Sequence, residues 1–159
     1  FHPEYFIVQE FIEGDEYTCG TVYLGDEYHG AIIMRRILRD GDTYKCFVEH
    51  NETIASALQH LITNIRPYGA CNVQLRLKNG EPYIFEINAR CSGTTAARTL
   101  CGFNEPRMIA DYLLKSIKPE HHVVKKTILR YWNELEVDPS EVEALNAKGE
   151  VHRNTYPGL

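Results

Sequence analysis

The first third of the chain alternates between short apolar runs and polar breaks that contain glycine and aspartate. Residues 5–12, 17–24, 28–39 and 43–49 are rich in β-branched and aromatic residues, and turn-forming residues separate them. Short connections between successive strands favour antiparallel pairing. The pattern therefore predicts an antiparallel meander over residues 5–49.

A helical period replaces the strand pattern after residue 50. Asn51 is a suitable N-cap, apolar residues follow at positions 54, 58, 61, 62 and 65, and Pro67 ends the helix. The remaining expected elements are strands at 69–78, 82–88 and 123–132 and helices at 94–100, 105–118 and 140–148. Together they predict an α+β fold class, an antiparallel sheet flanked by helices.

Composition and net charge argue against some classes of function. The chain has 159 residues, of which 43% are hydrophobic, and this suits one packed core. Its formal net charge of −5 argues against a broad nucleic-acid surface, and no apolar run approaches the roughly 20 residues of a membrane span. We therefore expect neither nucleic acid nor a membrane among its partners.

The ends and the cysteines of the chain lead to two further expectations. Residue 1 is not Met and a strand-like run begins almost at once, so we expect a piece of a longer polypeptide. The five cysteines are odd in number and form no C-x-x-C pair, so neither a disulfide framework nor a zinc cluster is expected. The predicted location is the cytoplasm.

The hairpin at residues 69–88 carries unusual polarity on one face. Side chains alternate across a strand, so the apolar face holds Val73, Leu75, Leu77, Phe85 and Ile87. The opposite face then carries Gln74, Glu86, Asn88 and Arg90. Polar groups on a hairpin need a partner or water, because their unpaired burial is unfavourable.

The register of this hairpin decides whether the polar side chains meet. A two-residue loop at Asn79-Gly80 pairs Gln74 with Phe85 and turns Gln74 to the apolar face. A three-residue loop at 78–80 pairs Gln74 with Ile84 instead. We predict the three-residue loop, because it places the apolar residues of both strands on one face.

The chemistry of the polar face suits a hard cation. Oxygen ligands from Gln74, Glu86 and Asn88 fit Mg²⁺, which binds one or two carboxylates together with water and phosphate. Arg90 lies one strand step further and can hold a phosphate or carboxylate in fork geometry. The residues alone leave open a second interpretation, a solvated hairpin face that binds nothing.

The segment Glu86-Ile-Asn88-Ala-Arg90 after Asn72-Val-Gln74 resembles the C-terminal lobe of ATP-grasp enzymes, in particular the large chain of carbamoyl-phosphate synthase. The run at residues 7–17 is similar to the hinge segment of that family, and the resemblance extends over residues 5–132. It divides the chain into a C-terminal lobe at 1–132, with the upstream lobe absent, and a C-terminal extension at 133–159.

The resemblance implies a site for ATP. The backbone at Glu10, Phe11 and Ile12 would contact adenine, and Glu16 would accept hydrogen bonds from the ribose hydroxyls. Arg35 is expected to approach the transferred phosphate, while Arg36 is expected to point away. Without the resemblance, the preferred interpretation of Glu16 is a surface acid beside a turn.

The resemblance also implies cofactors and a reaction. Two Mg²⁺ ions, with Mn²⁺ as an alternative, would be bridged by Glu86 and flanked by Gln74 and Asn88. Arg90 would steady the transferred group. The expected reaction is phosphorylation of a small carboxylate or bicarbonate by ATP, followed by attack of an amine or another nucleophile on the acyl phosphate.

Two alternatives to an active ligase lobe stay open. One is a non-catalytic ATP-grasp-like module that binds or assembles within a larger or split enzyme. The other is an unrelated antiparallel α+β protein, in which Gln74 and Glu86 would not share a face. The missing N-terminal lobe is expected on the same polypeptide or on a separate chain, and we expect the isolated fragment to be inactive.

Overall fold

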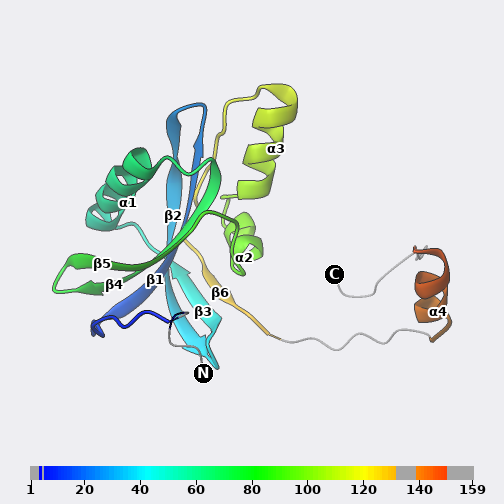
Figure 1. Cartoon of the computed structure of the whole chain (residues 1–159), viewed down its shortest axis with the longest axis horizontal. Coiled ribbons are helices and arrows are strands. Elements are labelled where there is room, and N and C mark those ends of the chain that lie inside the picture. The colour runs from blue at the N-terminus through cyan, green and yellow to red at the C-terminus, as the bar shows by residue number, and fades with distance from the viewer. Residues whose placement is uncertain (1–3, 5, 132–138, 150–159) are drawn as a thin grey trace.

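A six-stranded antiparallel sheet forms the centre of the protein. The computed structural model describes residues 4, 6–131 and 139–149. The strands are β1 (Asp15–Leu24), β2 (Glu27–Arg39), β3 (Asp42–Val48), β4 (Gly69–Lys78), β5 (Glu81–Asn88) and β6 (Thr127–Leu129). Their order in the sheet is β5-β4-β1-β2-β3-β6 (Figure 1). The predicted α+β fold class and the predicted meander β1-β2-β3 are confirmed.

Helices cover both faces of the sheet (Figure 1). The helices are α1 (Glu52–Ile65), α2 (Thr95–Leu100), α3 (Glu105–Lys115) and α4 (Pro139–Lys148). Helix α1 buries Ile54, Leu58 and Ile62 against one face of β1, β2 and β4. Helices α2 and α3 pack with Phe103 and Met108 against the other face. Within the described residues, no helix combines the length and apolar character needed to cross a bilayer.

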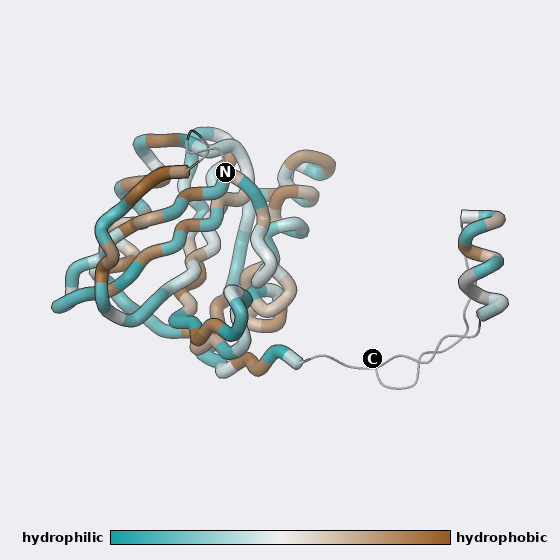
Figure 2. Tube along the Cα trace, turned by 60° about the horizontal axis from the view of Figure 1, so that its bottom comes forward, coloured by the Kyte–Doolittle hydropathy of each residue, from teal (hydrophilic) through white to brown (hydrophobic). Residues whose placement is uncertain are grey.

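The alternation of side chains sets which residues belong to which face. Figure 2 shows hydrophobic and hydrophilic positions alternating along the strands. In β1 the odd positions Tyr17 and Cys19 pack under α1, whereas Val22 and Leu24 pack under α2 and α3. The buried apolar cluster on that second face does not extend to the end near Glu16. This polar end carries the candidate site.

Three predicted elements differ from the structure. Residues 6–13 have no regular secondary structure, because this segment is not hydrogen-bonded into the sheet. Among the described residues of the predicted strand 123–132, only Thr127–Leu129 pair with β3 and form a strand, and residue 132 lies outside the described residues. Helix α3 ends at Lys115 rather than at residue 118, because Ser116 adopts a left-handed C-cap with φ 54°.

The predicted register of the β4–β5 hairpin is wrong. Lys78 pairs with Glu81, so the loop has two residues, Asn79 and Gly80, with φ angles of 53° and 83°. Positive φ at both loop positions is the type I′ turn that Asn-Gly favours. The register then shifts at a β-bulge, and Gln74 pairs with Glu86. The extra residue in β5 therefore turns Gln74 and Glu86 to the same face of the hairpin. The three-residue loop had predicted this shared face, although its register is wrong.

Candidate active site

The polar end of the sheet brings together side chains from four strands. Pairing of β1 with β2 places Glu16 opposite Arg36, and pairing of β1 with β4 places Glu16 opposite Arg76. Directly opposed residues in antiparallel strands point to the same face. Thr18 lies opposite Gln74, and Gln74 lies opposite Glu86. One sheet face therefore carries a continuous row of polar groups.

Glu16 is held between two guanidinium groups. Arg36 donates from Nη2 to Oε1 of Glu16 at 2.5 Å, and Arg76 donates from Nη2 to Oε2 at 2.6 Å. The Glu16 side chain is only 12% exposed. Arg36 also donates to Oε1 of Gln74. Charge-assisted bonds of this kind are stronger than neutral ones, so they hold the Glu16 carboxylate in one orientation.

A cavity of about 720 Å³ lies between the hinge segment and β5. Its lining includes Gln9, Glu10, Phe11, Ile12, Glu16, Arg76 and the β5 residues 82–85. The guanidinium of Arg76 stacks over the ring of Phe11, 4.7 Å from the ring centroid. All of the residues predicted to contact adenine and ribose therefore border one cavity. Its volume lies in the range typical of small-molecule sites.

The hairpin supplies oxygen donors beside this cavity. Gln74 and Glu86 are cross-strand neighbours, and Asn88 follows two positions later on the same face. Asn88 donates from Nδ2 to Oε1 of Glu86 at 2.5 Å, so these two side chains are in contact. Within the described residues, no three His, Cys, Asp or Glu side chains form a metal-binding group. The candidate donors are instead one carboxylate and two amides, a set that Mg²⁺ accepts.

The predicted placement of the β2 arginines is wrong. Arg35 lies on the face covered by α1, where Nε donates to Oε1 of Glu49 at 2.7 Å. Tyr17 donates to the other oxygen of Glu49, and burial raises the pKa of the Tyr17 hydroxyl. The hydrogen bond to Glu49 also raises the pKa of the Arg35 guanidinium above its ordinary value. Arg36 instead lies with Glu16, because the β1–β2 register places it there.

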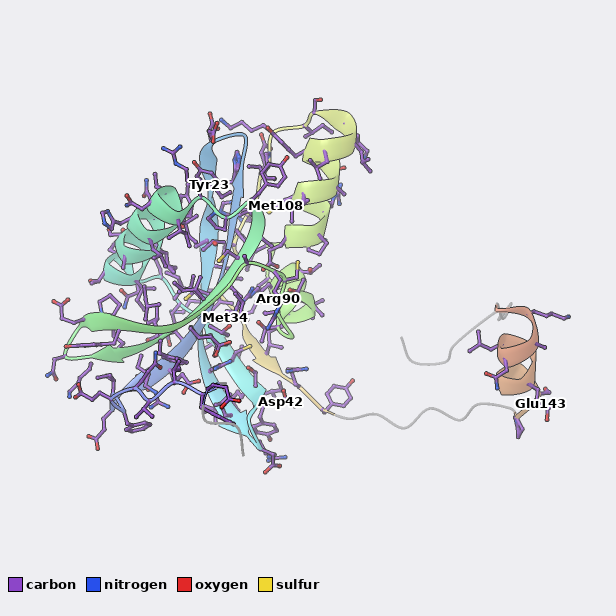
Figure 3. All side chains as sticks on the ribbon, viewed as in Figure 1. Tyr23, Met34, Asp42, Arg90, Met108 and Glu143 are labelled. Carbon is purple, nitrogen blue, oxygen red and sulfur yellow. The ribbon has the colours of Figure 1, made fainter. Side chains whose placement is uncertain are left out.

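Arg90 follows β5 and points toward a second, smaller cavity. Figure 3 shows Arg90 beside α2, in the loop that leaves β5. The cavity has a volume of about 120 Å³, and Arg36, Gln74 and Arg90 are among its lining residues. Arg90 is exposed, and its Nη1 donates to the carbonyl of Cys91 at 2.9 Å. The structure therefore brings Arg90 to the same polar face as Gln74.

A buried ionic network supports this face from below. Arg98 of α2 is fully buried, and its Nη1 donates to Oε1 of Glu105 at 2.6 Å. Its Nη2 donates to Oγ1 of Thr18 at 3.0 Å and to Oδ1 of Asn72. Gly20 leaves space for this pair, since a Cβ there would lie 2.5 Å from Oε1 of Glu105. The network fixes Thr18 and Asn72 at the base of the polar face.

The sequence patterns did not predict that several of these residues belong to the site. Arg36, Thr18 and Asn72 reach the site through strand register, and Arg98 reaches it through the packing of α2. Alternation alone places Thr18 on the face of Glu16. It gives no information about which β2 arginine joins them.

Comparison with known proteins identifies the family. A family model described as "ATP-grasp in the biosynthetic pathway with Ter operon" matches residues 2–136. The chain belongs to the ATP-grasp family. A comparison with curated protein sequences finds no significant match.

Solved structures agree with this fold assignment. The phosphoribosylaminoimidazole carboxylase ATPase subunit of Aquifex aeolicus is 18% identical, with a TM-score of 0.64 over 88% of this chain and 48% of its own. An L-amino acid ligase from Bacillus licheniformis is 20% identical, with a TM-score of 0.56 over 90% of this chain and 42% of its own. Phosphoribosylglycinamide synthetase from Anaerococcus prevotii is 19% identical, with a TM-score of 0.59 over 74% of this chain and 34% of its own. The ATP-grasp chain therefore spans half or less of the length of these structures.

Proposed function

We propose that this ATP-grasp chain is the ATP- and Mg²⁺-binding lobe of a ligase that activates a carboxylate as an acyl phosphate. The main supporting observation is that Gln74 pairs with Glu86 on the same sheet face as Glu16, beside the hinge cavity. Membership of the ATP-grasp family supports the proposal. The similarity of residues 72–90 to the large chain of carbamoyl-phosphate synthase favours a ligase of that type.

The hinge cavity is the proposed nucleotide site. The carbonyl of Glu10 and the amide of Ile12 are the backbone groups proposed to pair with the edge of adenine. Glu16 is proposed to accept hydrogen bonds from the ribose hydroxyls. Oε1 of Glu16 already accepts from Nε and Nη2 of Arg36, and Oε2 accepts from Nη2 of Arg76. An ionised carboxylate has about four acceptor sites, so the arginines orient Glu16 and leave about one site, on Oε2, for a ribose hydroxyl.

The hairpin donors fit the metal that the family implies. Gln74, Glu86 and Asn88 would hold two Mg²⁺ ions, with Mn²⁺ as an alternative. When bound, the metal neutralises charge on the phosphates of ATP. The exposed carboxylate of Glu86 is the charged member of this set.

The chain's arginines complete the proposed chemistry. A substrate carboxylate oxygen forms a bond to the γ-phosphorus, the bond between that phosphorus and the bridging oxygen breaks, and ADP leaves with the electron pair. Arg36 replaces Arg35 in this proposal, because Arg36 lies on the polar face. Arg36 and Arg90 would stabilise the negative charge on the transferred group. The nucleophile then displaces phosphate from the acyl carbon.

A second lobe is proposed to close the hinge cavity, either in the same polypeptide or as a separate chain. The hinge segment exposes apolar side chains, with Ile7 80% exposed and Val8 fully exposed. Adjacent exposed apolar residues are typical of a surface that another part of the protein covers. The isolated chain is accordingly expected to bind nucleotide weakly and to have no turnover.

Replacement of Glu86 by Gln in the complete protein tests this function. The Glu86→Gln variant keeps the size of the side chain but removes the charge that faces the metal. We expect ATP hydrolysis to fall at least about 100-fold, the range for loss of one charge-stabilising group. Glu81→Gln at the other end of β5 is the matched control and should retain activity. Unchanged hydrolysis in a folded Glu86→Gln variant would instead favour a non-catalytic binding or assembly module.

A further inference from the structure

Strand β6 lies at one edge of the sheet, and its outer side is unpaired within the described residues. It pairs with β3 alone, at the end of the strand order β5-β4-β1-β2-β3-β6 (Figure 1). The other edge strand, β5, borders the hinge cavity. An edge strand exposes backbone N–H and C=O groups that another extended chain can bind. The outer side of β6 is therefore a candidate docking edge.

The hydrogen bonds to β3 determine which backbone groups of β6 face outward. The carbonyl of Lys126 accepts from the amide of Val48 of β3 at 2.9 Å. Hydrogen-bonded and non-hydrogen-bonded pairs alternate in an antiparallel ladder, so the even-numbered residues of this segment face β3. The amides and carbonyls of Thr127 and Leu129 therefore point away from the sheet, where an added strand can reach them.

The segment around β6 is positively charged in a chain that is acidic as a whole. The formal net charge of the chain is −5, whereas residues 121–131 contain Lys125, Lys126 and Arg130 and no Asp or Glu. The side chains of Lys126 and Arg130 donate to backbone carbonyls at 2.7 and 3.1 Å, which leaves their charges without a counter-ion. Within the described residues, Lys125 forms no ion pair either. The segment therefore favours an acidic partner.

The centre of the edge is apolar and open. Leu129 is 59% exposed, and Thr127 is exposed two positions before it. Thr127 lies opposite Phe47, and both border a surface cavity of about 530 Å³ together with Lys125. This cavity leaves room for a side chain of an added strand. The edge therefore offers a short apolar centre with a cation beyond each end.

We propose that the outer edge of β6 binds an extended segment of a partner protein as an added strand. The segment has about three apolar residues between acidic ends, to match the three residues of β6 and the cations that flank them. A symmetric pair of two copies centred on Ile128 fits less well, because it would set Lys126 of each copy opposite Arg130 of the other. No residue of β6 lines the hinge cavity, so docking here goes beyond the proposed ligase function.

Fluorescence anisotropy of a labelled peptide tests the docking edge in the full chain. The probe Glu-Glu-Val-Ile-Val-Glu-Glu reads the same in both directions, so its acids meet the cations in either strand orientation. We expect saturable binding that weakens with added salt, because surface charges are screened. The peptide Glu-Glu-Gly-Ser-Gly-Glu-Glu has the same charge but low strand propensity, and it should bind at least about tenfold more weakly.

Two pairs of variants test the backbone and the charge separately. Thr127→Pro removes an outward amide proton and keeps the bonds to β3, because edge strands accept proline at such a position. It should weaken binding about fivefold, the scale of one lost hydrogen bond, whereas Thr127→Val should not. Lys125→Glu should also weaken binding about fivefold, whereas Lys78→Glu on the distant strand β4 should have no effect.

A charge-exchanged peptide separates docking from loss of structure. The Lys125→Glu chain should bind Lys-Lys-Val-Ile-Val-Lys-Lys more tightly than the unmodified chain does, because one repulsive contact becomes attractive. A gain of affinity cannot result from misfolding.

Three outcomes would overturn the proposal. One is the absence of saturable binding of the acidic probe. Another is equal affinity of the Thr127→Pro and Thr127→Val variants, or of the two acidic peptides, which would make the segment a charged patch without strand addition. The third is a dimer of the peptide-free chain in sedimentation velocity that Thr127→Pro abolishes, which would make this edge an interface between copies.

Discussion

The buried ion pair between Arg98 and Glu105 leads to a quantitative prediction about stability. The two side chains are 0% and 1% exposed, and they join α2 and α3 to Thr18 and Asn72 of the sheet. Arg98→Met leaves the Glu105 carboxylate buried without a cation. Glu105→Leu leaves the Arg98 guanidinium buried without an anion. We expect each single variant to lose about 3–5 kcal/mol of unfolding free energy, a large share of a typical 5–15 kcal/mol.

The double variant is expected to lose less than either single variant. Replacement of a buried ion pair by apolar residues of similar volume is often neutral, because it also removes the desolvation penalty. Here Nε of Arg98 and Oε2 of Glu105 have no hydrogen-bond partner, so the pair is incompletely satisfied. Buried polar atoms without a hydrogen-bond partner lower the net contribution of the pair to the unfolding free energy further. The two substitutions should therefore be strongly non-additive.

Urea unfolding followed by far-UV circular dichroism measures all three variants. Arg107→Met is the control, since Arg107 is 78% exposed and lies 3.3 Å from Asp111 one helical turn away. An exposed pair of this kind contributes about 0.3–0.5 kcal/mol. Losses below 1 kcal/mol in both buried single variants, or a double variant that equals their sum, would refute the reasoning.

Two other predictions concern the turn of the hairpin and the buried thiols. Gly80→Ala should lower the unfolding free energy by about 1–2 kcal/mol in urea, because φ is 83° there, whereas Gly93→Ala should cause no such loss. Both sites are open to a methyl group, so equal losses would contradict the backbone explanation. Burial raises the pKa of Cys19 from 9.0 to about 12, so above pH 9 the unfolded thiol ionises while the folded one stays neutral. Stability should therefore fall as pH rises, and Cys19→Ala should reduce that slope by about 1 kcal/mol per pH unit in urea titrations; an unchanged slope would argue against it.

The sequence predicted the elements of this fold wherever a short-range pattern decides them. Asn51 caps α1 as expected, since its side chain accepts from the amide of Ile54 at 3.0 Å. The meander and the β4–β5 hairpin also follow from local turn chemistry and alternation. The polar donors Gln74, Glu86 and Asn88 do share a face, as the alternation predicted. The roles assigned to them in metal binding stay predictions.

Register and helix packing were decided only in three dimensions. The hairpin turn has two residues and a bulge follows it, a combination that apolar matching along each strand did not reveal. A shift of one residue exchanges the faces of a strand, so the choice between Arg35 and Arg36 depended on pairing with β1. Arg130 reaches the smaller cavity for the same kind of reason, through pairing of β6 with β3. Periodicity along a chain specifies which side chains share a face, whereas pairing between distant strands specifies which faces meet.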